Sequence, residues 1–299
     1  MRPVLRLARF AFFFCCCFAL LARSAFAADR VTILYDAFGS NQALTRDWGF
    51  SALVEHDGKR ILFDTGNNPE IFEHNVKALN VDLTKLDFVV VSHRHTDHAS
   101  GLRYLLKINP DVTVYVPADG ANGFGGAELP AAFFRPEPSL PARMRYFDGT
   151  YPEHGRAGKL YDTGHFVLVD KLTEVTPGIF LVYTVSKIPR TLELPEITLA
   201  IKGPHGLILV DGCSHSGIEE ILQAASAVDP HTHIVFGGLH LVQTPVPDID
   251  RLVDSLKNKW KLDEIAPGHC TGEPAFLRLQ KAFGEHYLYA GVGTRMDVP

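Results

Sequence analysis

The stretch Val89-Val90-Val91-Ser92-His93-Arg94-His95-Thr96-Asp97-His98 decides how the rest of the chain is interpreted. An apolar run ends there in side chains that commonly bind metal ions. Because residues i and i+2 of an extended segment point to the same side, His93 and His95 can present both imidazoles to one ion. Asp97 and His98 fall where the chain turns into an amphipathic helix, so their side chains can face a second ion. The pattern predicts a metal site at a strand end.

Chance clustering is the alternative, because the chain contains 14 histidines. Isolated histidines are ordinarily surface residues or hydrogen-bonded core residues. Few structural roles, however, require three imidazoles and a carboxylate at one strand end. The metal-site interpretation is therefore favoured.

The segment 1–27 has the pattern of an export signal. Arg2, Arg6 and Arg9 precede an apolar run at 10–21, and Ala25-Phe26-Ala27 offers a small-x-small cleavage site. The apolar run is too short to span a bilayer comfortably, and an uncleaved amino-terminal anchor is the alternative. Cleavage predicts a periplasmic or secreted protein, residues 28–299, that has no membrane contact after the signal is removed.

Residues 28–299 fit one large α/β domain, since no linker separates two halves. The whole chain has 29 Lys+Arg against 34 Asp+Glu, and the signal contains only basic charges. The remaining acidity argues against nucleic acid as a partner, because phosphate binding needs a basic face. We expect a small-molecule substrate, and the sequence gives no prediction of oligomeric state.

Cysteines are the next candidates, because only Cys213 and Cys270 lie outside the signal. In an exported protein two cysteines form a disulfide by default. Both are next to histidines in glycine-rich turns, as Cys213-Ser214-His215 and His269-Cys270, so a place beside the metal competes with the disulfide. The metal neighbourhood is favoured for Cys213, and both interpretations stay open for Cys270.

Hydrophobic periodicity predicts strands and helices in both halves. In the first half, the order is strand, strand, strand, helix, strand, helix, strand, with Asp57-Gly58 as a hairpin signal and a helix at 69–79. The segment at about 117–161 loses periodicity and is interpreted as an irregular insertion, either facing the substrate or lying on the surface. The predicted ranges are strands at 31–35, 51–55, 60–63, 88–91, 112–116, 179–184, 197–201, 206–210 and 233–236, and helices at 218–227 and 249–257.

These motifs make the chain similar to the metallo-β-lactamase superfamily over nearly all of residues 28–299. The His-x-His-x-Asp-His signature is His93, His95, Asp97 and His98, and a later Pro-Gly-His element ends at His269. The resemblance implies an α/β fold of the αββα four-layer sandwich type. It also implies that the first two histidines bind one metal ion, that the Asp-His pair and His269 bind a second, and that a hydroxide lies between them.

The middle of the pattern departs from the commonest members, in which a Gly-His turn precedes a strand that ends in a bridging Asp. Here that strand ends in a Gly-Cys-Ser-His turn. Together with Gly-Gly-x-His-Leu at 237–241 and His-Cys-Thr-Gly at 269–272, this turn is similar to the dihydropterin ribofuranosylaminobenzene phosphate synthase-like proteins. We expect His215 to complete the ligands of the first metal and Cys213 to occupy the bridging position, with Asp211 as its rival.

The ligand types suggest the chemistry. An open position on Zn²⁺ lowers the pKa of bound water from about 15.7 to about 7. We expect two divalent metal ions, preferably Zn²⁺, with Mn or Fe as alternatives because oxygen ligands admit them. Asp97 and His240 are the catalytic candidates; His240 can contact substrate or protonate a leaving group, or be buried for packing. Asp64 is a candidate for orienting a metal-bound histidine, or for capping a turn.

Three functions are compatible with these residues. The leading hypothesis is an exported metal-dependent hydrolase that uses a metal-bound hydroxide on a small ester, amide, lactone or phosphodiester. The second is a metal-dependent transferase of the dihydropterin ribofuranosylaminobenzene phosphate synthase type, which fits poorly with export. The third is a non-catalytic zinc-binding protein, which an open coordination position argues against, since structural zinc sites are normally closed by four protein ligands.

Overall fold

The computed structural model of the protein describes residues 29–118, 163–189 and 191–298, with short pieces at 127–129, 138–139, 141, 145, 150, 155–157 and 161. The expected signal at 1–27 and most of the expected insertion at about 117–161 lie outside the described residues. Among the helices that are described, none has the length and apolar character needed to cross a membrane.

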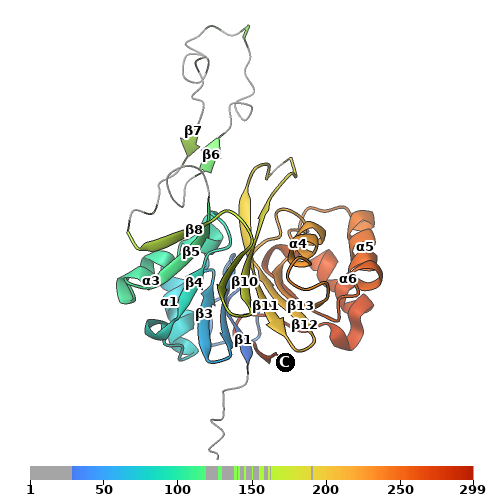
Figure 1. Ribbon diagram of the computed structural model, residues 1–299, viewed down its shortest axis with the longest axis horizontal. Helices are drawn as coiled ribbons and strands as arrows, with labels where there is room; N and C mark the ends of the chain where they lie inside the picture. Colours follow the sequence, from blue (N-terminus) through green and yellow to red (C-terminus); the bar gives the residue numbers. More distant parts are fainter. Residues whose placement is uncertain are drawn as a thin grey trace, which may run out of the picture.

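Two β-sheets lie face to face in the centre of the domain (Figure 1). In the first sheet the strand order is β15-β1-β2-β3-β4-β5-β8. The strands β3, β4, β5 and β8 run parallel to one another, whereas β15, β1 and β2 join antiparallel. Their bounds are β1 Arg30–Tyr35, β2 Ser51–His56, β3 Lys59–Phe63, β4 Phe88–Val90, β5 Thr113–Pro117, β8 His165–Val169 and β15 Arg295–Asp297.

The second sheet has the order β14-β13-β12-β11-β10-β9. Here β12, β13 and β14 are parallel, and β9 to β12 are joined as antiparallel neighbours. A separate pair, β6 (Ala127–Leu129) and β7 (Gly155–Ala157), is antiparallel. The bounds are β9 Thr173–Thr176, β10 Ile179–Val185, β11 Pro195–Gly203, β12 Gly206–Asp211, β13 Thr232–Gly238 and β14 Glu264–Gly268.

Helices cover the outer face of each sheet (Figure 1). Side chains of α1 and α3 share one hydrophobic cluster with the first sheet, and side chains of α4, α5 and α6 share another with the second. The four layers confirm the expected αββα sandwich. The helices are α1 Pro69–Ala78, α2 Thr96–Ala99, α3 Leu102–Ile108, α4 Ile218–Ala225, α5 Val246–Asp254 and α6 Glu273–Phe283, with 3-10 turns at Leu83–Lys85, His269–Thr271 and Gly284–His286 and a π-helical turn at Ser255–Lys259.

Burial of both sheet faces explains the apolar runs in the sequence. In β12, Ile208 and Val210 pack between the two sheets, whereas Leu207 and Leu209 pack against the helices. A strand buried on both faces has no polar side and therefore shows no alternation. The same holds for β4, so the strands that precede the candidate ligands are rigidly held in the core.

Most predicted elements are confirmed, with their ends shifted by a few residues. The predicted helix at 69–79 is α1, which begins at Pro69 because the Asn68 side chain accepts hydrogen bonds from the first turn. The helix predicted at 249–257 instead begins at Val246 and ends at Asp254 before the π-helical turn. The elements that were missed include β6 and β7, which lie in the segment predicted to be irregular, and β8, β9, β15 and α6. Their apolar patterns are short or one-sided.

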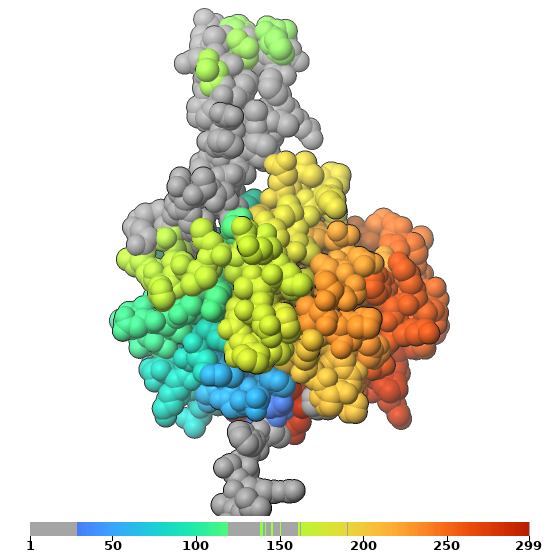
Figure 2. Space-filling model, in the orientation of Figure 1, coloured from blue at the N-terminus to red at the C-terminus, as the bar shows by residue number. Residues whose placement is uncertain are grey.

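The turn between β10 and β11 stands above the body of the two sheets, in yellow in the space-filling view (Figure 2). Exposed apolar side chains gather on it: Val185 is 37% exposed, Ile188 43% and Leu192 54%. The hairpin therefore presents apolar side chains at the rim of the sandwich.

Replacing Phe236 by Ala should lower the free energy of unfolding by about 3–5 kcal/mol, because a fully buried ring between the sheets is removed and a cavity remains. Urea unfolding followed by circular dichroism measures this loss. The control Leu277→Ala, at a side chain that is 64% exposed on α6, should change the free energy by less than about 0.5 kcal/mol. Equal losses in both variants would contradict the assignment of the inter-sheet core.

Candidate metal centre

The candidate ligands converge where parallel strands of both sheets end. Parallel strands present their carboxyl ends at one edge of a sheet, which is where ligands bind in such folds. The two edges are joined there by a backbone hydrogen bond from Ile197 N to Ser92 O of 2.9 Å. The residues delivered to this seam are His93 and His95 after β4, Asp97 and His98 on α2, Cys213 and His215 after β12, and His269 after β14.

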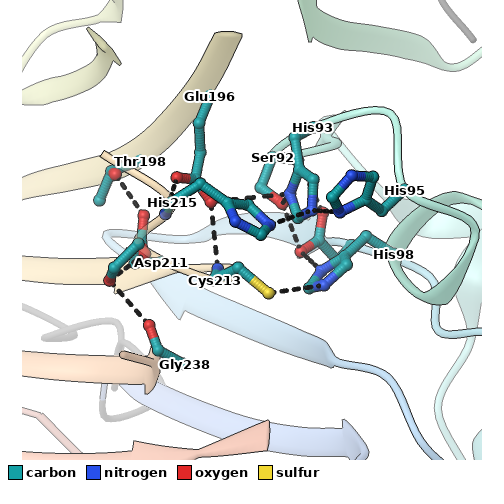
Figure 3. A network of polar contacts seen from close by, with 12 residues as sticks. Ser92, His93, His95, His98, Glu196, Thr198, Asp211, Cys213, His215 and Gly238 are labelled. Atoms are coloured by element: carbon teal, nitrogen blue, oxygen red, sulfur yellow. Dashed lines mark hydrogen bonds and ion pairs between the residues drawn. The ribbon is translucent and has the colours of Figure 1, made fainter. Parts of the chain in front are cut away.

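Three imidazoles form the first group of candidate ligands (Figure 3). The Nε2 atom of His93 lies 3.1 Å from Nδ1 of His95 and 3.2 Å from Nε2 of His215. The rings of His93 and His215 are buried. Two sheets thus supply one cluster of ring nitrogens, which we call the imidazole triad.

Two imidazoles and a carboxylate form the second group. The Nε2 atoms of His98 and His269 are 3.2 Å apart. The Oδ2 atom of Asp97 lies 3.3 Å from Nε2 of His269 and 3.7 Å from Nε2 of His98. We call Asp97, His98 and His269 the mixed triad.

The spacing of these atoms fits divalent metal ions. Ligand nitrogens held about 2.0–2.1 Å from a tetrahedral Zn²⁺ lie about 3.3 Å from one another. Three pairs of ring nitrogens lie 3.1 to 3.2 Å apart: His93 and His95, His93 and His215, and His98 and His269. Without an ion, two ring nitrogens that face each other in a buried site would need a proton between them. That each triad holds one ion stays a prediction. The structure does bring together six of the residues expected to bind metal, His93, His95, Asp97, His98, His215 and His269.

Cys213 lies between the two triads. Its Sγ atom is 3.3 Å from Nε2 of His98, toward which it points in Figure 3, and it forms a possible ligand group with His93 and His98. The rival for this position, Asp211, accepts hydrogen bonds from the hydroxyls of Thr198 and Ser214 instead. The structure therefore places the sulfur of Cys213 among the candidate ligands and Asp211 behind the turn, and the bridging role of Cys213 stays a prediction.

Cys270 and His240 lie on the other side of Cys213. The two cysteines are free and buried, with their Sγ atoms 3.2 Å apart. The ring of His240 is 4.3 Å from that of His215, measured between centroids. Because His240 is exposed, the alternative that it is buried for packing is wrong.

Asp64 orients a candidate ligand, as predicted. Its carboxylate accepts hydrogen bonds from Nδ1 of His98 at 2.7 Å, from Ser92 N at 2.7 Å and from Ser92 Oγ at 2.8 Å. Because the Nδ1–H of His98 is donated to Asp64, Nε2 is the ring nitrogen that faces the centre. The residue follows β3 in a left-handed conformation with φ of 54°.

Two buried acids at the centre were missed by the sequence analysis. Glu196 on β11 accepts hydrogen bonds from the backbone N–H groups of Cys213 and His215, at 3.1 and 2.7 Å. Asp36, after β1, accepts a hydrogen bond of 2.9 Å from the backbone N–H of His269. Both acids hold turns that carry candidate ligands. The sequence does contain one signal for Glu196, because an acidic residue within an otherwise apolar strand indicates a buried charge with a special role.

Burial shapes the protonation states at the centre. Burial and the neighbouring imidazoles lower the pKa of His95 to about 4 and that of His215 to about 2, so both rings are neutral at pH 7. Neutral imidazole is the form that binds metals. Burial raises the pKa of Asp97, but the hydrogen bond from His269 and the nearby imidazoles outweigh it and bring this pKa below its ordinary value. Burial also raises the pKa of Asp36 to about 8.

A pocket of about 330 Å³ opens onto the triads. The indole of Trp48 forms one wall, 45% exposed and tilted against the His269 ring at a centroid distance of 4.8 Å. Trp48 was not singled out from the sequence. The pocket is lined by Trp48, Thr191, His240, Val242 and Gln243 together with the candidate ligands His95, Asp97, Cys213, His215 and His269 and with Cys270.

Replacing Asp64 by Asn should weaken Zn²⁺ binding by about 10–100-fold, because the acceptor that orients His98 is lost. Competition against a chromophoric chelator measures the affinity. The matched control is Asp263→Asn, since Asp263 also accepts hydrogen bonds of 2.8 Å from two histidines, His231 and His233, which belong to neither triad. Unchanged affinity in Asp64→Asn would contradict the orienting role.

The sequence of the chain is similar to those of known proteins. The family model of the Metallo-beta-lactamase superfamily matches residues 45–249. The chain is 29% identical over 301 aligned positions to the 7,8-dihydropterin-6-methyl-4-(β-D-ribofuranosyl)-aminobenzene-5′-phosphate synthase of Methanocaldococcus jannaschii, covering 87% of this chain and 94% of the relative.

Solved structures agree on the fold. A metal-dependent hydrolase of the β-lactamase superfamily has a TM-score of 0.69 at 24% identity, covering 90% of this chain and 99% of its own. A metallo-β-lactamase fold protein from Bacillus subtilis has a TM-score of 0.53 at 12% identity, with the same coverage. The match of the family model to more than half of the chain, together with this fold, shows that the chain belongs to the metallo-β-lactamase superfamily.

Proposed function

We propose that this protein is an exported metal-dependent hydrolase that acts on a small ester, amide, lactone or phosphodiester. The observation that carries the proposal is the convergence of the imidazole triad and the mixed triad on one open pocket. Structural metal sites are normally closed by their protein ligands, whereas catalytic sites keep a side open to substrate. The open pocket favours catalysis over zinc storage.

The donor set supports two divalent ions, Zn²⁺ by preference. The imidazole triad would hold one ion and the mixed triad the other. When bound, such ions supply Lewis acidity and lower the pKa of coordinated water, which is the chemistry that hydrolysis needs. Nitrogen donors and a sulfur donor suit Zn²⁺, and the Asp97 carboxylate would also admit Mn or Fe.

The pocket walls support a small substrate that is partly apolar. Trp48 and Val242 offer apolar surface, while Thr191 and Gln243 offer hydrogen-bonding groups. The volume of about 330 Å³ is that of a small-molecule site. The acidic balance of the chain gives no support for nucleic acid as a substrate.

His240 is the candidate for proton transfer to the leaving group. Its imidazole lines the pocket beside His215 and is exposed. An imidazole can give a proton to a leaving oxygen or nitrogen near neutral pH. Asp97, held by His269, stays ionised and is therefore assigned to metal binding. Export is supported by the pattern of residues 1–27.

A transferase is the second candidate, because one relative that matches most of the chain is a synthase. In that case the same centre would activate an organic nucleophile instead of water. The two candidates are separated by assaying metal-loaded protein with esters, lactones, amides and phosphodiesters, and with a pterin diphosphate plus an aminobenzene riboside. Turnover of only the pterin pair would replace the hydrolase proposal by the transferase.

Replacing His95 or Asp97 by Ala should lower kcat/KM by about a thousandfold or more, because the Lewis acidity supplied by metal ions contributes several kcal/mol to catalysis. Activity is measured on the substrate found in that screen, and metal content and circular dichroism are recorded for each variant. The control His286→Ala, at an exposed histidine outside both triads, should keep wild-type activity. Folded ligand variants with wild-type turnover would refute the proposed centre.

A further inference from the structure

A third group of donor atoms lies beside the two triads. The Sγ atoms of Cys213 and Cys270 and a ring nitrogen of His240 all lie within 4.8 Å of one another. Cys270 has no role in the proposed hydrolysis, whereas Cys213 is the expected bridging ligand and His240 the candidate proton donor. An ion bound at this third group and proton transfer by the same ring nitrogen of His240 would therefore exclude each other. Cys270 Sγ donates a hydrogen bond of 3.2 Å to Cys213 Sγ, and both thiols are free and buried, so two soft donors lie side by side.

These donors come from three consecutive strand ends of the second sheet. Cys213 follows β12, His240 follows β13 and Cys270 follows β14. The turns are tied together by backbone hydrogen bonds, from Leu241 N to Cys270 O at 3.0 Å and from Gly238 N to Gly212 O at 3.2 Å. The arrangement therefore depends on the sheet and not on a single mobile loop.

The backbone around the donors is strained in each turn. Ser214, His240 and His269 have left-handed conformations, with φ of 58°, 52° and 44°. Residues other than glycine adopt this region at a cost, and such strain persists where the surroundings enforce it, commonly at functional sites. Each strained residue is itself a donor of the group or is the chain neighbour of one.

Glycine makes room for the sulfur of Cys270. A Cβ atom on Gly238 would lie 2.7 Å from that sulfur and 2.5 Å from Gly212 O, closer than real Cβ atoms come. Gly237, with φ of 108°, would place a Cβ 1.9 Å from Asp211 O. Two adjacent glycines thus allow β13 to approach both cysteine-bearing turns.

We propose that Cys213, Cys270 and His240 form a third ligand triad, which binds a thiophilic divalent ion such as Zn²⁺ or Cd²⁺ beside the ions of the other two triads. Two sulfurs and an imidazole are a softer donor set than either of those triads, and soft donors select such ions. Each thiol loses its proton to solvent when the ion binds. His240 is exposed, and Cys213 and Cys270 are among the residues that line the pocket, so the group borders space that an ion can enter.

The experiment compares the wild-type chain with Cys270→Ser, both reduced, stripped of metal and reloaded with Cd²⁺. Native mass spectrometry counts the ions, and ultraviolet absorption records sulfur-to-metal charge transfer. The wild type should bind one more ion per chain than Cys270→Ser and absorb more strongly. Equal ion counts and equal absorption in the two proteins would overturn the proposal, as would an intact mass that shows a Cys213–Cys270 disulfide in the reloaded wild type.

His240→Gln provides a second test at an exposed position, which keeps the proposal falsifiable if Cys270→Ser fails to fold. This variant removes a direct ligand, which should cost at least the roughly tenfold loss of affinity seen when a residue that orients a ligand is removed, while the other two ions remain bound. The matched control is His286→Gln, which removes an exposed histidine outside all three triads and should bind ions like the wild type. Identical Cd²⁺ titrations for His240→Gln and His286→Gln would contradict the assignment. No substrate is involved, so failure here leaves the hydrolase proposal standing.

Discussion

The hydrogen bonds that the Asp64 carboxylate accepts are the interactions on which the centre depends most. It lies at the end of β3 and accepts hydrogen bonds from the backbone and hydroxyl of Ser92, after β4, and from the ring of His98 on α2. The group is fully buried, so its desolvation has to be offset by these donors. One side chain thereby fixes the spacing of two strand ends and the rotation of one candidate ligand.

Other buried carboxylates repeat this arrangement behind the remaining turns. Asp36 and Glu196 accept backbone hydrogen bonds from the turns that carry His269 and His215, and Asp211 accepts hydroxyl hydrogen bonds within the same layer. The imidazoles face the pocket and the acids lie behind them. Such a layer orients the ligands from behind, as hydrogen-bond partners of metal-binding histidines commonly do.

The sequence was informative where the physical signal is local. Apolar runs buried on both faces mark β4 and β12, and the alternate spacing of His93 and His95 marks the centre, because both depend on neighbours in the chain. Glu196 gave no comparable signal, because its hydrogen-bond partners lie 17 and 19 residues further along. The sequence also could not settle whether Cys213 or Asp211 faces the imidazoles, because the conformation of the turn decides which of the two side chains does so.

Because the ligands come from both sheets, the centre can assemble only when the sandwich is closed. His93 and His215 are 122 positions apart in the chain and meet only across the seam. An ion that requires both sheets binds the folded chain and not the unfolded one, and adds about 2.7 kcal/mol of stability at a concentration of 100 times its dissociation constant. Metal supply in the protein's surroundings would thus govern its lifetime as well as its chemistry, and starvation for the ion would expose the chain to proteolysis.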